Sequence, residues 1–132
     1  MNITNIKKII VLIVLLFSSL LVAKEQTLYC SSDNSTGFVD TDKNGNYEQT
    51  EFVREKFELK IDFQNNTFTS ADLTMEDATC INYLPFIQCI DFGYGININK
   101  ENLNFILYKG FGHLSGQNDT ISISYGSCEL SK

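Results

Sequence analysis

The stretch from residue 40 to residue 51 is rich in side-chain oxygen, and its spacing suits a hard cation. Six of its residues offer an oxygen ligand: Asp40, Asp42, Asn44, Asn46, Glu48 and Glu51. Calcium takes six to eight oxygen ligands, and a tightly curled loop can bring alternate side chains to one point. Gly45 would permit the sharp turn, because glycine adopts positive φ without strain. Calcium is therefore the one cofactor that the sequence indicates.

This stretch resembles the twelve-residue calcium loop of EF-hand proteins, with D-x-D-x-N-G at its head and a glutamate in the twelfth place. The resemblance implies side-chain oxygens from Asp40, Asp42 and Asn44, a backbone carbonyl from Asn46, a water-mediated contact from Glu48 and a bidentate carboxylate from Glu51. The flanks depart from that family, since residues 31–37 favour turns and an alternating strand begins soon after Glu51. A polar hairpin loop turned by Asn44 and Gly45 is the alternative.

Four cysteines predict two disulfides: Cys30, Cys80, Cys89 and Cys128. An even number of cysteines behind an export signal is typical of a disulfide framework. Of the three possible pairings we favour Cys30 with Cys128, which would tie the first strand to the last. Cys80 with Cys89 would then close a local loop around Pro85. Zinc is disfavoured, because the only close spacing is C-x8-C and the chain has one histidine.

Catalytic motifs are lacking, so we expect the protein not to be an enzyme. The single histidine, His113, lies in the glycine-rich stretch 110–116. A serine or cysteine nucleophile would need that imidazole as its base, and no pattern around it marks an activated nucleophile. Acidic residues are numerous enough for a hydrolytic pair, but sequence does not place two carboxylates across a cleft. A small hydrolase is therefore kept as an alternative.

The N-terminus predicts export. Lys7 and Lys8 precede an apolar run of 14 residues from Ile9 to Val22, and Ala23 supplies a small residue at the expected cleavage site. This length fits the apolar core of a signal peptide, whereas a bilayer span needs about 20 residues. We therefore expect residues 1–23 to be a signal peptide. The mature chain is predicted to be periplasmic or secreted, with no stable membrane span after cleavage; a retained anchor is the alternative.

The mature chain, residues 24–132, has the length of a single small domain and is acidic. Without the two leader lysines, eight basic residues face sixteen acidic ones, a formal charge of −8. Nucleic acid and anionic lipid both reward clustered lysine and arginine, so we expect neither as a partner.

Alternation with a period of two predicts an all-β fold. From residue 57 to 63 the apolar residues Phe57, Leu59, Ile61 and Phe63 alternate with polar ones. Residues 64–66 then form a predicted turn into the strand 67–69, and two later stretches, 96–107 and 121–126, repeat the pattern. In the last, Ile121, Ile123 and Tyr125 alternate with Ser122, Ser124 and Gly126. Short strands separated by Asn, Gly and Ser turns indicate a small antiparallel sandwich or barrel, held by the disulfides.

A binding module is the leading functional class. Aromatic residues that could line a ligand or partner surface cluster near glycines and the predicted Cys80–Cys89 loop: Tyr83, Phe86, Phe92, Tyr94 and Phe111. Core packing is the alternative for them, because aromatic side chains supply much buried area. We expect the partner to be a protein or a glycan in the envelope or outside the cell.

Gly37-Phe38, Tyr47, Phe52 and the segments 57–63 and 121–128 resemble uncharacterised small exported proteins of AT-rich marine bacteria. That resemblance implies an extracytoplasmic compartment and a strand-rich fold, without an assigned activity. The size, leader and paired cysteines also resemble small periplasmic β-barrel proteins, including the lysozyme inhibitors of bacterial envelopes. An envelope inhibitor is therefore a further alternative.

Overall fold

Strands make up the fold, and no helix is present in the residues that the structure describes. The computed structural model describes residues 25–41, 45–73, 75, 78–110 and 120–131, so the predicted signal peptide lies outside them. The nine strands are β1 (Gln26–Asp40), β2 (Tyr47–Glu51), β3 (Lys56–Asp62), β4 (Thr67–Thr69), β5 (Thr79–Tyr83), β6 (Phe86–Asp91), β7 (Tyr94–Asn99), β8 (Asn104–Lys109) and β9 (Thr120–Leu130).

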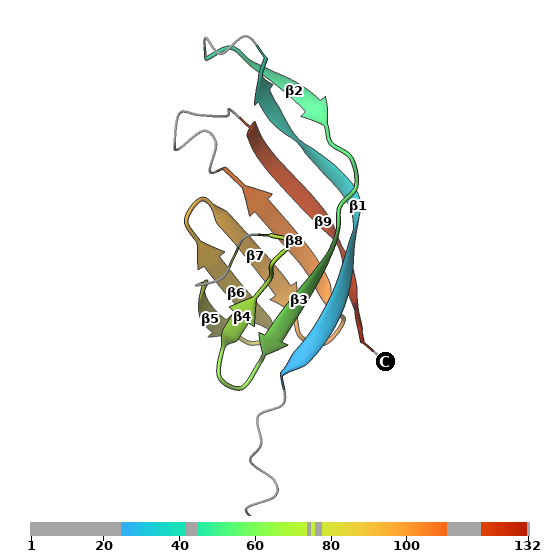
Figure 1. Ribbon diagram of the computed structural model, residues 1–132, viewed down its shortest axis with the longest axis vertical. Helices are drawn as coiled ribbons and strands as arrows, with labels where there is room; N and C mark the ends of the chain where they lie inside the picture. The colour runs from blue at the N-terminus through green and yellow to red at the C-terminus, as the bar shows by residue number, and fades with distance from the viewer. Residues whose placement is uncertain (1–24, 42–44, 74, 76–77, 111–119, 132) are drawn as a thin grey trace, which may run out of the picture.

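The strands form one antiparallel sheet that curls into a nearly closed barrel. Its order is β4-β3-β1-β9-β8-β7-β6-β5, with β2 paired to β1 outside this path. The long strand β1 links the two halves, because it pairs with β9 on one side and with β3 and β2 in succession on the other. The two ends of the sheet, β4 and β5, lie against each other (Figure 1). The predicted all-β fold is confirmed, in its barrel form.

The apolar core lies inside the barrel. On β3, Phe57, Leu59 and Ile61 point inward and are at most 4 % exposed, which confirms the predicted half-buried strand. The predicted turn and hairpin after this strand are also confirmed, because β4 pairs with β3. The inner residues of β7 and β8 complete this core from the opposite wall: Ile96, Ile98, Phe105 and Leu107. Across the barrel the rings of Phe57 and Phe105 meet edge to face, 5.2 Å between centroids.

Both favoured disulfides are confirmed. Cys30 and Cys128 are directly paired residues of β1 and β9, so this bridge joins the first strand to the last. Cys80 and Cys89 are directly paired residues of β5 and β6, and their bridge closes the hairpin that turns at Leu84 and Pro85.

The last strand is confirmed. Unlike a simple amphipathic strand, it has its small polar residues on the buried face and its large apolar residues on the exposed face. Ser122, Ser124 and Gly126 point into the barrel and are buried, whereas Ile123 and Tyr125 are 53 % and 54 % exposed. Close approach of the strands requires small inner residues here. A Cβ atom added to Gly126 would lie 2.1 Å from the carbonyl oxygen of Ser31 on β1. A β-bulge between Ser32 and Asn34 lies in the same strand pair, where bulges increase the local twist.

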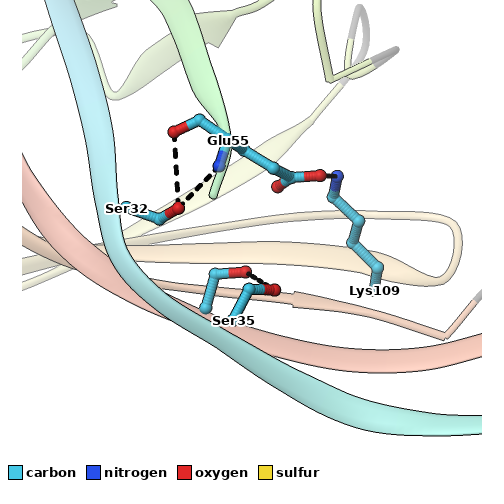
Figure 2. A network of polar contacts seen from close by, with 5 residues as sticks. Ser32, Ser35, Glu55 and Lys109 are labelled. Carbon is cyan, nitrogen blue, oxygen red and sulfur yellow. Dashed lines mark hydrogen bonds and ion pairs between the residues drawn. The ribbon is translucent and has the colours of Figure 1, made fainter. Parts of the chain in front are cut away.

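A network of polar contacts lies beside these small residues (Figure 2). Glu55, between β2 and β3, donates its backbone N–H to the hydroxyl of Ser32 over 2.7 Å, and its carboxylate pairs with the ammonium of Lys109. Ser124 donates to Ser35 over 2.8 Å, and this pair is buried. The network thus joins Glu55 to β1 and to β8, and it joins β9 to β1.

Candidate binding site on the outer face of the barrel

The predicted calcium loop is the hairpin between β1 and β2. Asp40 is the last residue of β1, and its carboxylate accepts a 2.6 Å hydrogen bond from the N–H of Gly45, which has φ of 81°. This bond joins the end of β1 to the segment that leads into β2. Asp42 and Asn44 lie outside the described residues, while Asn46 directly precedes β2.

The two glutamates of this stretch lie along β2. Asp40 pairs with Tyr47, whereas Glu51 pairs with Thr36, four residues further along β1. At roughly 3.3 Å per residue, Glu51 is therefore about 13 Å from the head of the hairpin. Glu48 pairs with Val39, the neighbour of Asp40. Because successive side chains of a strand point to opposite faces, Glu48 and Asp40 are on opposite faces of the hairpin. Strands, in place of the helices of an EF-hand, lie directly before residue 41 and directly after residue 46. Calcium binding stays a prediction for the connection between them.

We expect 10 mM calcium to stabilise the protein by about 1 to 3 kcal/mol, which corresponds to a Kd of about 0.1 to 1 mM. Asp40→Asn should remove this effect, because the amide retains an acceptor for Gly45 but loses the charge. Glu51→Gln should leave it intact, since that carboxylate is remote. Thermal unfolding with and without calcium measures both. Loss of the effect in Glu51→Gln would mean that the hairpin rearranges around the ion, and no effect in the wild type would refute the prediction.

The predicted aromatic cluster divides between surface and core. Three of its members are on the surface, as predicted for a binding surface. The exposed fractions are 57 % for Tyr83, 47 % for Phe86 and 70 % for Phe92. Tyr94 is partly buried and packs against the core. Phe111, like His113, lies outside the described residues.

Around these aromatics, the outer face of the sheet carries almost no charge. Outward and inward positions alternate along β6, β7, β8 and β9, and the strand registers place the outward positions side by side. We call the following outward residues the uncharged face: Phe86, Gln88, Ile90, Gly95, Asn97, Asn99, Asn104, Ile106, Tyr108, Ile121, Ile123, Tyr125 and Ser127. Among the outward positions of these four strands, the charged exception is Glu129 at the end of β9. Figure 1 shows the four strands as neighbours.

The outward positions of β3 are different. Lys56, Glu58 and Lys60 all point away from the core there, between the buried residues of the strand. Charged residues of both signs are the usual means of keeping a protein surface soluble. Because residues 24–132 have a formal charge of −8, the lack of charge at the outward positions of four adjacent strands is a local feature of this face rather than of the composition.

The uncharged face has an apolar part, over β8 and β9. Tyr125 lies opposite Ile106, and Ile123 lies opposite Tyr108, so aromatic and aliphatic side chains alternate across the two strands. Where β8 ends and β9 begins is a groove of about 360 Å³. The apolar residues Ile90, Tyr108, Ile121 and Ile123 line it, and the charged Asp91 and Lys109 lie at its edge. The ring of Tyr108 lies across β7 at Gly95, where an added Cβ would be 1.9 Å from the ring. Glycine is therefore required beneath this tyrosine.

The face also has an amide part, over β6, β7 and the turn into β8. Here a pocket of about 230 Å³ is lined by the buried Phe105 and by six outward or turn residues: Phe86, Asn97, Asn99, Asn102, Asn104 and Ile106. Four of the six carry a side-chain amide. Each amide can both donate and accept hydrogen bonds without bringing a charge. The face thus combines exposed apolar side chains with neutral polar groups, a composition suited to binding.

Sequence reasoning found Phe86 and Tyr83 but missed Ile106, Ile123, Tyr125 and the four asparagines. The apolar members were missed because alternating Ile and Tyr usually mark the buried side of a strand. One signal was present: between Thr120 and Leu130 the other side of β9 carries Ser122, Ser124, Gly126 and Cys128, which are too small to fill a core. The asparagines were missed because asparagine between strands normally indicates a turn.

Neither a spanning helix nor a metal cluster is found in the part of the chain that the structure describes. None of its segments forms a helix long and apolar enough to cross a bilayer. No group of three or more His, Cys, Asp or Glu side chains is gathered there in a way that could hold a metal ion.

Comparison of the chain with protein-family models, with curated proteins and with solved structures gives no match.

Proposed function

We propose that this protein is an exported binding protein that captures an uncharged ligand on the uncharged face of β6–β9. The observation that carries the proposal is the composition of that face. On it Phe86, Ile106, Ile123 and Tyr125 are each 47 % to 54 % exposed, with no charged side chain between them. Large exposed apolar patches are rare on soluble monomers and mark interaction sites.

Export is the part of the proposal that the disulfides support. Two disulfides suit an oxidising compartment outside the cytoplasm, where such bridges form and persist. Together with the predicted signal peptide, they support a ligand in the envelope or in the surroundings of the cell. Enclosing the core within a barrel also leaves a rigid surface, so little conformational entropy would be lost on binding.

Site-specific photocrosslinking in cells that export the protein tests this proposal. A benzophenone amino acid replaces Ile123 on the uncharged face or, as a control, Lys60 on β3. We expect a crosslinked product from position 123 and none from position 60, because only the first position contacts the ligand. Adding Ile106→Glu to the first variant should abolish the product, since a carboxylate then enters the interface. Equal crosslinking from both positions, or crosslinking from position 60 alone, would contradict the assigned face.

A further inference from the structure

We infer that the asparagine pocket on the uncharged face is a subsite for one sugar ring of a neutral glycan. This inference rests on the proposed function and names its ligand class. The pocket is lined by Phe86, Asn97, Asn99, Asn102, Asn104, Phe105 and Ile106. Its volume of about 230 Å³ is below the roughly 300 to 1,000 Å³ of pockets for drug-sized molecules, and it suits a single ring.

Two of the four amides are oriented by the turn between β7 and β8. The side-chain oxygen of Asn99 accepts the N–H of Glu101 over 2.8 Å, and that of Asn102 accepts the N–H of Asn104 over 3.0 Å. Because these oxygens are engaged by the backbone, each amide is fixed and its NH₂ group is left to serve as a donor. Two donors are thus preorganised at one rim of the pocket.

The other two amides lie on the strands themselves. Asn97 points outward from β7, where it pairs with Ile106, and Asn104 begins β8. Within the described part of the chain the side chains of both have no hydrogen-bond partner. Each therefore offers an acceptor and two donors to a ligand. A sugar hydroxyl both donates and accepts, so carboxamides match it in a way that a carboxylate or an ammonium alone does not.

The turn that carries this arrangement is held in a strained conformation. Leu103 has φ of 57°, a left-handed value that is unusual for a bulky residue. Backbone hydrogen bonds retain this conformation: the N–H of Leu103 donates to the carbonyl of Asn99, and the carbonyl of Leu103 accepts from the N–H of Cys128. The side chain of Leu103 also packs against the core. Such strain persists where the surrounding structure over-determines it, commonly at binding sites. Leu103 lies between Asn102 and Asn104 in the chain, so its fixed backbone conformation also fixes the positions of these two asparagines.

The walls and the charge balance select a neutral glycan. Phe86 and Ile106 are about half exposed and supply apolar surfaces for the C–H faces of a sugar ring. No charged side chain lines the pocket among the described residues, and the ammonium of the nearby Lys100 lies over the ring of Phe63 instead. A sulfated or uronic-acid glycan would meet no compensating cation there, and an acidic protein repels it.

Isothermal titration calorimetry of the protein with hexasaccharides tests the inference. The probes are the neutral hexamers of β-1,4-glucose, β-1,3-glucose, β-1,4-xylose, β-1,4-mannose and β-1,4-N-acetylglucosamine, with hexagalacturonate as the charged comparison. We expect at least one neutral hexamer to bind with a submillimolar Kd and hexagalacturonate not to bind. The side-chain NH₂ signals of Asn97 and Asn104 should shift in NMR spectra on titration.

The variant Asn97→Asp with Asn104→Asp should weaken the binding of that hexamer at least tenfold, because it removes donors and adds charge at nearly constant shape. Asn82→Asp is the control for added charge, since it adds one such carboxylate at an exposed position of β5 outside the pocket, where Asn82 pairs with the inward-facing Ile87. Circular dichroism checks that all variants are folded. Binding equal to the wild type in the double variant, or no neutral hexamer bound at millimolar concentration, would overturn the inference. If photocrosslinking from position 123 succeeds in that case, the proposed function stands with a protein as the ligand; if it also fails, both fall.

Discussion

Removing the disulfide between Cys30 and Cys128 is expected to lower the free energy of unfolding by about 4.7 kcal/mol. The bridge joins residues 98 positions apart and so restricts nearly the whole mature chain when it is unfolded. The chain-entropy relation gives about that value for a loop of roughly 100 residues. Small domains are stable by only about 5 to 15 kcal/mol, so the loss is a large fraction of the total. Equilibrium unfolding in urea of the Cys30→Ala, Cys128→Ala variant measures it.

The second disulfide supplies the internal comparison. Cys80 and Cys89 are nine positions apart, and the same relation gives about 2.6 kcal/mol for a loop of that length. The Cys80→Ala, Cys89→Ala variant should therefore be the more stable of the two. If it were the less stable, the entropic account would be wrong, and local strain or packing in the β5–β6 hairpin would dominate.

Leu107→Ala is expected to lower the free energy of unfolding by about 2 to 5 kcal/mol, since large-to-small changes in a core lose both transfer energy and packing. Leu107 is 1 % exposed and lies inside the barrel, opposite the small Ser124. Little neighbouring side-chain volume is available there to collapse into the cavity, which favours the upper part of this range.

Its neighbour Ile106 is the matched control. It is 50 % exposed on the other face of the same strand, so Ile106→Ala should cost less than about 1 kcal/mol. Urea unfolding of both variants therefore tests which face of β8 is the core. Equal losses, or a larger loss for Ile106→Ala, would contradict the assignment of the uncharged face and with it the proposed function.

Local patterns predicted part of the fold. They were wrong for residues 31–37, which favour turns by composition but lie within the long strand β1. The alternation from Phe57 to Ile61 and the turn at residues 64–66 predicted β3 and its hairpin with β4, because strand periodicity and turn chemistry act over a few residues. The even number of cysteines predicted two disulfides and allowed three pairings. The favoured one, Cys30 with Cys128 and Cys80 with Cys89, is the one in the structure. Cys89 lies just beyond a turn from Cys80, and the first and last strands of a small barrel are neighbours.

Local patterns were not sufficient for the site. In β9 the alternation of Ile123 and Tyr125 with Ser122 and Ser124 defines two faces but does not say which one meets the core. That choice depends on how closely β1 approaches β9 and on where Glu55 and Lys109 lie, and these contacts come from residues far apart in the chain. The calcium-like stretch is a similar case, because Asp40 and Glu51 are separated by the register of a hairpin rather than by their spacing in sequence.

By itself, then, the sequence determined that this chain forms antiparallel strands and two disulfides, since those properties depend on residues close in sequence or on their chemical type. The tertiary structure alone decided that the apolar side of β9 faces outward and that asparagines from two strands and a turn line one pocket. The physical reason is that a surface is assembled from strands in their spatial order. That order and the inward side of each strand are set by packing around the closed sheet.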